Sequence, residues 1–172
     1  MKVAIIVGHS EDERGAYNSD YRISEFEFNN IVANHLKLIS EHDIEVVYRN
    51  KYYELPEKVN KINAKINISL HCNAFNQTAT GTEVLSSGSA GSLKLASYIQ
   101  SRMIELFELS DRGVKIRTEG RGAYILMQTI APTILIEPFF IDNNFDIKKG
   151  ILNIVDYAFA INEAIKEYET NL

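Results

Sequence analysis

The sequence contains a single cysteine, Cys72, among its 172 residues. One cysteine excludes an intrachain disulfide framework and any metal site built from several cysteines, so a metal would have to be bound by histidine and carboxylate side chains. Long hydrophobic runs are also missing. No apolar segment approaches the roughly 20 residues that a helix needs to cross a bilayer, and we therefore expect no membrane insertion.

Positive charge is scarce, with 18 lysines and arginines against 23 aspartates and glutamates and a formal net charge of -5. No run of basic residues is present, so the electrostatic signature of nucleic-acid or anionic-lipid binding is lacking. The segment Met1-Lys2-Val3 passes directly into an apolar stretch that is too short for a signal peptide and has no small-residue cleavage site. We expect synthesis in the cytoplasm without a signal peptide.

The chain has no repeat, low-complexity tract or linker, so we expect a single domain over residues 1–172. Its 45% hydrophobic residues are enough to build a substantial core. Apolar, β-branched runs indicate buried strands, and amphipathic segments between them indicate helices. The predicted fold is α/β, with a mixed, mostly parallel sheet flanked by helices on both faces. Predicted strands are 3–7, 44–48, 66–70, 81–85, 123–126 and 133–137, and the longest predicted helix spans 89–109.

The predicted strand 66–70 delivers a histidine at its C-terminal end. Alternation places Ile68 and Leu70 on one face and His71 on the other, where it can face a cleft. Cys72 then points away from His71 and is expected to be a small core residue. Taken alone, His71 is better interpreted as a strand-end histidine satisfied by backbone groups, so a functional role requires partners.

Two further apolar strands end in a chemically active side chain. His9 follows strand 3–7, and Glu137 closes strand 133–137. A glutamate is rarely buried without a partner or a task. Because the carboxyl ends of parallel strands meet at one edge of a sheet, we expect His9, His71 and Glu137 to lie close together.

A capping box predicts the start of a helix near the same edge. Ser24 as the N-cap can accept a hydrogen bond from the amide of Glu27, whose side chain can reach back to Ser24. Glu25 is then the carboxylate left free in the first turn, beside the loop that follows His9. Both glutamates could instead complement only the positive helix terminus, an interpretation that we accept for Glu27 but not for Glu25.

The residues His9, Glu25, His71 and Glu137 together favour one chemistry. Two imidazoles and a carboxylate are the ligand set of a catalytic zinc ion, with a fourth position left for water. Zinc lowers the pKa of its bound water from about 16 to about 7. A carboxylate that is not a ligand can accept the proton and pass it to a leaving nitrogen. The pattern therefore favours metal-assisted hydrolysis of an amide.

Several motifs resemble a known family. They are Gly8-His9-Ser10, Ser24-Glu25-Phe26, Ser69-Leu70-His71-Cys72-Asn73-Ala74, Gly81-Thr82-Glu83 and Leu135-Ile136-Glu137-Pro138-Phe139-Phe140. Their order and character are similar to those of the zinc N-acetylmuramoyl-L-alanine amidases of type 3, a group that includes bacterial autolysins and the catalytic domains of clostridial phage endolysins. The resemblance covers essentially the whole chain.

The resemblance implies a sheet of about six strands and a single Zn²⁺ ion. Zinc would be held by His9, Glu25 and His71, with Glu137 as the catalytic carboxylate. The bond cut would be the amide between N-acetylmuramic acid and the L-alanine of the stem peptide in peptidoglycan. We accordingly expect a monomer that acts on the bacterial cell wall after release, outside the cell or in the periplasm.

The same analogy extends to the substrate groove. Asn73 and Glu83 would flank this groove. The segment from Asp111 to Gly122 is basic and rich in glycine, and we predict a mobile loop there. It is either an ordinary connection or a site for an anionic or carboxylate-bearing substrate, in which case its arginines, Arg112, Arg117 and Arg121, would meet the peptide.

The chain departs from the commoner family pattern beside the first histidine. An acidic residue usually stands shortly before it and a glycine after it, whereas this chain has Ile6-Val7-Gly8-His9-Ser10. The carboxylate that would orient His9 is thus missing from that position, and another group must fix the ring. A separate wall-binding domain, often attached in this family, is not expected here.

Two alternatives stay open at this point. A zinc carboxypeptidase or a deacylase would use the same metal ligands and the same glutamate on a different amide. A non-catalytic wall-binding module could also keep this fold. Loss of a ligand or of the catalytic glutamate would favour the module, and the sequence retains all four residues.

Overall fold

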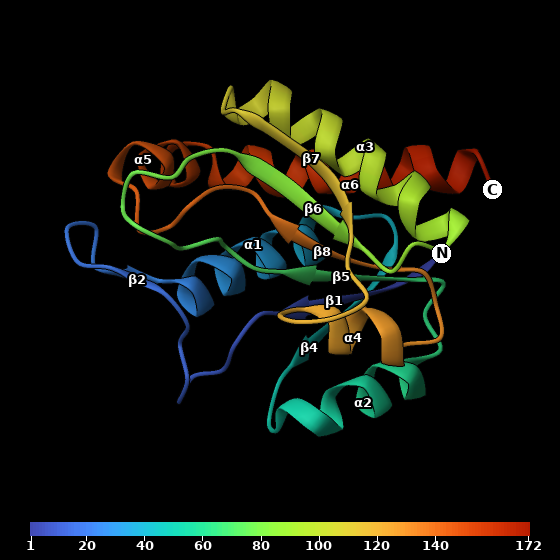
Figure 1. Ribbon diagram of the computed structural model, residues 1–172. Coiled ribbons are helices and arrows are strands. Elements are labelled where there is room, and N and C mark those ends of the chain that lie inside the picture. The colour runs from blue at the N-terminus through green and yellow to red at the C-terminus, as the bar shows by residue number, and fades with distance from the viewer.

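The computed structural model describes residues 1–172 and contains a central six-stranded sheet (Figure 1). Its strands are β1 (Lys2–Val7), β4 (Asp43–Tyr48), β5 (Ile66–Leu70), β6 (Thr82–Ser86), β7 (Asp111–Ile116) and β8 (Thr133–Glu137), in the order β4-β1-β5-β8-β6-β7. Strands β4, β1, β5 and β8 are parallel, β6 is antiparallel to β8, and β7 is parallel to β6. The prediction of a mixed, mostly parallel α/β sheet is confirmed.

Helices cover both faces of this sheet (Figure 1). They are α1 (Glu25–Ile39), α2 (Leu55–Ile62), α3 (Ala90–Phe107), α4 (Ala123–Gln128), α5 (Asn144–Leu152) and α6 (Ile154–Thr170), and a 3-10 turn, η1 (Tyr52–Glu54), precedes α2. A short antiparallel ribbon of β2 (Tyr17–Asn18) and β3 (Ile23–Ser24) leads into α1. None of the helices combines the length and the apolar character needed to cross a membrane.

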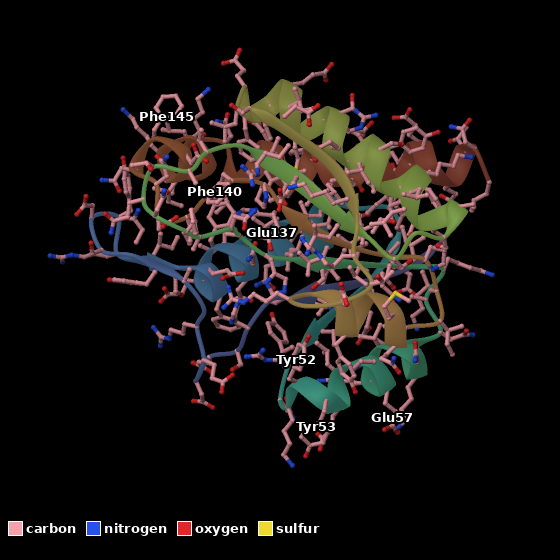
Figure 2. The ribbon with its side chains drawn as sticks, in the orientation of Figure 1. Tyr52, Tyr53, Glu57, Glu137, Phe140 and Phe145 are labelled. Carbon is pink, nitrogen blue, oxygen red and sulfur yellow. The ribbon has the colours of Figure 1, made fainter.

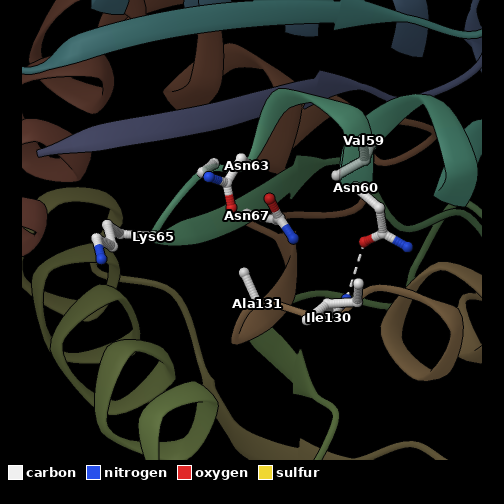
Figure 3. A pocket seen from close by; sticks show the side chains of 8 residues that line it. Val59, Asn60, Asn63, Lys65, Asn67, Ile130 and Ala131 are labelled. Carbon is white, nitrogen blue, oxygen red and sulfur yellow. Dashed lines mark hydrogen bonds between the residues drawn. The ribbon is translucent and has the colours of Figure 1, made fainter.

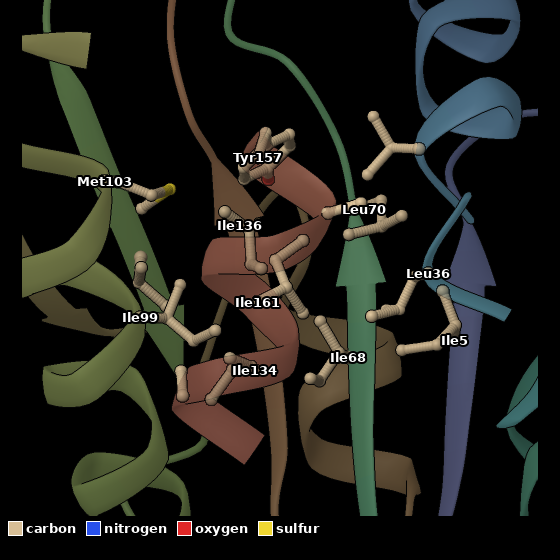
Figure 4. Close-up of a cluster of buried hydrophobic side chains, with 14 of the residues drawn as sticks. Ile5, Leu36, Ile68, Leu70, Ile99, Met103, Ile134, Ile136, Tyr157 and Ile161 are labelled. Carbon is tan, nitrogen blue, oxygen red and sulfur yellow. The ribbon is translucent and has the colours of Figure 1, made fainter. Parts of the chain in front are cut away.

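The larger hydrophobic core lies between the sheet and the helices α1, α3 and α6 (Figure 4). Ile68 and Leu70 of β5 point into this core, and Cys72 joins them. Ser69 and His71 instead line a cavity on the opposite face. The alternation in the sequence therefore predicts the orientation of this strand correctly.

The opposite face of the sheet is covered by two short helices, α2 and α4, of 8 and 6 residues. A smaller core packs beneath them, with Ile6 and Leu135 from the sheet and Leu55, Val59 and Ile125 from the helices. The main cavity of the protein, of about 910 Å³, lies on this face at the carboxyl ends of β1, β5 and β8.

A second cavity, of about 250 Å³, lies beside the amino end of β5 (Figure 3). Asn67 of β5 and Lys65 border it, and across it the Oδ1 atom of Asn60 accepts a hydrogen bond from the amide of Ile130 at 2.9 Å. This cavity contains none of the candidate site residues. The chemistry of the protein therefore has to be sought at the carboxyl edge.

The prediction of a strand over residues 123–126 is wrong, because these residues begin helix α4. Ile125 and Leu126 are buried, whereas Tyr124 and Met127 are exposed, which is the spacing of a helix that packs one side. Over so short an apolar segment, periodicity does not separate a helix from a strand.

The prediction of a loop over residues 111–122 is wrong in its first half, where Asp111–Ile116 forms the edge strand β7. One side of an edge strand borders solvent, so charged residues and glycine are tolerated there. The pairing of β7 with β6 is irregular: Thr82 is opposite Asp111, but Glu83 is opposite Gly113. Arg112 is the extra residue at this bulge.

Candidate active site

The structure brings His9, Glu25 and His71 together at the carboxyl edge of the sheet. Their ligand atoms all lie within 4.8 Å of one another. Nε2 of His9 is 3.0 Å from Oε2 of Glu25, and Nδ1 of His71 is 2.8 Å from Oε1 of Glu25. The carboxylate of Glu25 therefore lies between two imidazoles that follow β1 and β5.

The capping box of α1 separates the roles of its two glutamates. Oε2 of Glu27 accepts a hydrogen bond from the amide of Ser24 at 2.9 Å, and the amide of Glu27 donates to Oγ of Ser24 at 3.2 Å. Glu25 is only 4% exposed and faces the histidines instead. Its Oε1 accepts a hydrogen bond from the amide of Cys72 at 3.0 Å, and its Oε2 one from the amide of Ala16 at 3.3 Å.

The charge state of Glu25 follows from these contacts. Burial by itself raises the pKa of Glu25, but the hydrogen bonds and charges of His71 and His9 outweigh burial and hold that pKa well below its ordinary value. Glu25 is consequently an ionised carboxylate at neutral pH.

The donor set of these three residues fits a zinc ion. Two imidazole nitrogens and an ionised carboxylate oxygen are its usual protein ligands at catalytic sites. One ligand atom from each residue lies within 4.8 Å of the other two, so a single ion can be reached by all three side chains. His9, Glu25 and His71 could therefore hold the metal that the donor chemistry indicates.

Gly15 lies against the ring of His9 and the carboxylate of Glu25. A Cβ atom at Gly15 would lie 2.6 Å from Cδ2 of His9 and 2.6 Å from Oε2 of Glu25. Gly15 also has a φ of +76°, which favours glycine. His9 itself has a φ of 67°, a strained conformation that must be supported by its surroundings. Close packing of the Gly15 backbone thus restricts the orientation of the His9 ring.

We expect Gly15→Ala to weaken zinc binding by about 10- to 100-fold, as the loss of supporting contacts around metal ligands does elsewhere. The added Cβ would displace the His9 ring or the Glu25 carboxylate. Competition with a chromogenic chelator measures the change. Gly120→Ala is the matched control, because Gly120 has the same φ of +76° and nothing within 4 Å of an added Cβ. Equal zinc affinity in the two variants would contradict a positioning role for Gly15.

Glu137, at the end of β8, lines the same cavity (Figure 2). Burial raises the pKa of this carboxyl well above its ordinary value, and the negative charges of Glu25 and Glu83 raise it further, with Arg121 acting in the opposite direction. Its Oε2 has no hydrogen-bond partner. Glu137 thus holds a proton more readily than an ordinary glutamate and is free to exchange it with a group in the cavity.

Glu83 lies directly opposite Glu137 in the antiparallel pairing of β6 with β8. Burial raises the pKa of Glu83, but hydrogen bonds from Lys115, Arg112 and Asn73 lower it below its ordinary value. The Arg112 Nε–Oε2 distance is 2.9 Å and the Asn73 Nδ2–Oε1 distance is 3.1 Å. The two neighbouring carboxyl groups therefore differ: Glu83 is held ionised by cations, and Glu137 is biased toward its protonated form.

Three of the four predicted substrate-binding residues line the cavity, and one does not. Asn73, Glu83 and Arg121 line the cavity. Arg112 is not in the lining. Its guanidinium pairs with Glu83 and lies over the ring of Phe140, 5.0 Å from the ring centroid.

Two further cavity residues are not singled out in the sequence, and a third belongs to the basic segment 111–122 that the sequence predicts as a candidate substrate contact. Arg49 and Tyr52 line the cavity beside α2, and Arg117 lines it after β7. Arg49 directly follows β4, the parallel neighbour of β1, so its place at the same sheet edge was the available signal. Tyr52 lies in η1 (Figure 2). Its ring packs against that of Tyr124, with ring centroids 5.3 Å apart. No sequence motif marks either Arg49 or Tyr52 as a cavity residue.

Comparison with known proteins identifies relatives over nearly the whole chain. The family described as N-acetylmuramoyl-L-alanine amidase matches residues 3–167. The uncharacterized protein YqiI of Bacillus subtilis is 31% identical over 157 residues, which are 86% of this chain and 73% of YqiI. An uncharacterized cell wall amidase of Bacillus anthracis is 35% identical over 102 residues, which are 54% of this chain but only 18% of that protein.

The fold is shared with a solved structure. The crystal structure of N-acetylmuramoyl-L-alanine amidase from Clostridium difficile 630 is similar with a TM-score of 0.84 and 27% sequence identity. The similarity covers 98% of this chain and 96% of the other. It therefore includes every element that carries a candidate site residue.

Proposed function

The chain belongs to the N-acetylmuramoyl-L-alanine amidase family, and on that basis we propose that it is a zinc-dependent hydrolase of peptidoglycan. It would cleave the amide between N-acetylmuramic acid and the L-alanine of the stem peptide, as an autolysin or a phage endolysin does. The cluster of His9, Glu25 and His71 in one cavity with Glu137 is the observation that carries the proposal.

The metal site would be formed by His9, Glu25 and His71. Zinc bound there would supply Lewis acidity toward the carbonyl of the scissile amide. The amides of Cys72 and Ala16 fix both oxygens of Glu25, so this carboxylate does not have to reorganise when substrate enters.

Glu137 would carry the proton. As the carboxylate it accepts a proton from the water that attacks the carbonyl carbon, and as the acid it delivers this proton to the nitrogen of L-alanine while the carbon–nitrogen bond breaks. Its pKa is raised above that of an ordinary glutamate by burial, and this is the direction that general acid–base catalysis at neutral pH requires. Glu83 cannot replace it, since Arg112 and Lys115 hold Glu83 in its ionised form.

Identification of the released fragments tests this function. Purified protein loaded with one equivalent of zinc should release muramoyl sugars and free peptides that begin with L-alanine, without new reducing ends. Removal of zinc by a chelator should stop the reaction, and added zinc should restore it. Release of a C-terminal amino acid instead would show a carboxypeptidase with the same metal ligands. Release of no product from peptidoglycans of several chemical types would contradict the proposal.

A further inference from the structure

We propose that Arg117 and Arg121 form a subsite that binds a carboxylate on the peptide part of the substrate. The protein would then discriminate between a stem peptide with a free carboxylate and the same peptide with a neutral carboxamide at that position. The inference rests on the proposed function, because it names a substrate feature recognised beside the same catalytic residues.

Two of the three acidic side chains of the cavity already have charged or titratable partners. Glu25 lies between His9 and His71, and Glu83 pairs with Arg112 and Lys115. Glu137 is biased toward its neutral form by burial. None of these groups is left to neutralise a further cation in the cavity.

The cations in the cavity lining are less well satisfied. Arg49 pairs with Glu13 at 2.7 Å. Arg117 and Arg121 line the cavity, and neither forms an ion pair within the chain. In addition, the Nε atom of Arg117 is buried without a hydrogen-bond partner. A buried donor without a partner costs about 1–3 kcal/mol, so an occupant that accepts a hydrogen bond here would be stabilised.

The backbone at both arginines is held against the sheet. The amide of Arg117 donates to the carbonyl of Ser86 at 2.9 Å, which anchors it to the end of β6. The segment that follows bends back on itself before α4 begins (Figure 1), and Arg121 and Gly122 at its end line the cavity. A Cβ at Gly122 would lie 3.0 Å from Cδ1 of Leu135, so the turn carrying Arg121 packs against the sheet.

The guanidinium groups of Arg117 and Arg121 are suited to binding a carboxylate. A guanidinium presents its donors in a planar fork that matches a carboxylate, and it keeps its charge at every physiological pH. Arg121 is also close enough to Glu137 for its charge to lower the pKa of that carboxyl. A carboxylate bound by Arg117 and Arg121 would therefore belong to a part of the substrate near the scissile amide.

Two muropeptides that differ only at the residue after L-alanine, D-glutamate in one and D-isoglutamine in the other, test the proposal. We expect the parent protein to cleave the carboxylate form with a kcat/KM about 10-fold or more above that of the amide form, mostly through KM. Arg117→Gln and Arg121→Gln should bring the ratio of the two kcat/KM values close to one. Arg117→Lys and Arg121→Lys should keep part of it, because the charge remains.

Arg102→Gln is the matched control, since Arg102 pairs with Glu167 at 2.7 Å outside the cavity. Equal cleavage of both muropeptides by the parent protein, or an unchanged ratio in the glutamine variants, would overturn the subsite. Failure of the parent to cleave either muropeptide at the muramoyl–alanine bond would instead overturn the proposed function.

Discussion

Glu137→Gln should lower kcat for muropeptide cleavage by about 10²- to 10⁴-fold, the usual contribution of a positioned general acid–base. Glutamine keeps the shape and the hydrogen-bonding oxygen of the side chain but cannot release or accept the proton. Zinc content should remain at one equivalent, because Glu137 is not among the clustered ligand residues. Mass spectrometry of the released peptides, together with elemental analysis, measures both properties.

A matched control for this variant is Glu57→Gln, which changes an exposed glutamate of α2 that pairs with Lys61 (Figure 2). That change should leave cleavage unaltered. If Glu137→Gln degrades muropeptides as fast as the parent, Glu137 is not the proton carrier, and a non-catalytic wall-binding role on this fold regains support.

The free energy of unfolding of Glu137→Gln shows whether a loss of activity in this variant comes from a catalytic defect or from unfolding. Burial raises the pKa of Glu137 in the folded chain above its unfolded value, so the carboxyl contributes stability at low pH. This contribution is lost as the pH rises through the folded-state pKa. Glu137→Gln cannot ionise, and in the metal-free protein its stability relative to the parent should increase with pH. Urea unfolding at pH 5 and pH 8 measures the difference.

The candidate site residues that can be predicted from the sequence lie at the ends of strands or helices with a clear hydrophobic or capping pattern. His9, His71 and Glu137 each terminate an apolar strand, and the capping box predicts that Glu25 is free. Parallel topology then requires the strand ends to share one edge of the sheet. Local pattern and a general rule of topology were therefore sufficient to bring these residues together.

The features that the sequence does not predict depend on contacts between distant segments. Arg112 reaches Glu83 because a bulge in β7 places an extra residue there, and the bulge exists only in the pairing with β6. In the sequence, Gly15 cannot be told from other loop glycines, and only the folded structure shows that it lies against the His9 ring. The sequence places Arg117 in the basic segment 111–122, but no spacing reveals that its Nε is buried without a partner.

His71→Ala should abolish zinc retention, which is the largest effect we expect on the metal centre. The change leaves one imidazole and one carboxylate, and a zinc site with two protein ligands falls short of the three found in catalytic sites. It also removes the 2.8 Å contact that holds Oε1 of Glu25, so the remaining carboxylate is less fixed. Elemental analysis after dialysis should give close to one zinc per parent chain and almost none per variant.

His35→Ala provides the comparison, because His35 lies on α1 with Glu25 but outside the cavity. This variant should retain zinc and activity. The main chain around His71 is anchored independently of the imidazole, since its amide donates to the carbonyl of Ile136 at 3.0 Å. The fold should therefore survive in His71→Ala, and circular dichroism can verify this. A folded His71→Ala protein with full zinc content would show that the metal is held elsewhere, and the assignment of all three ligands would fail with it.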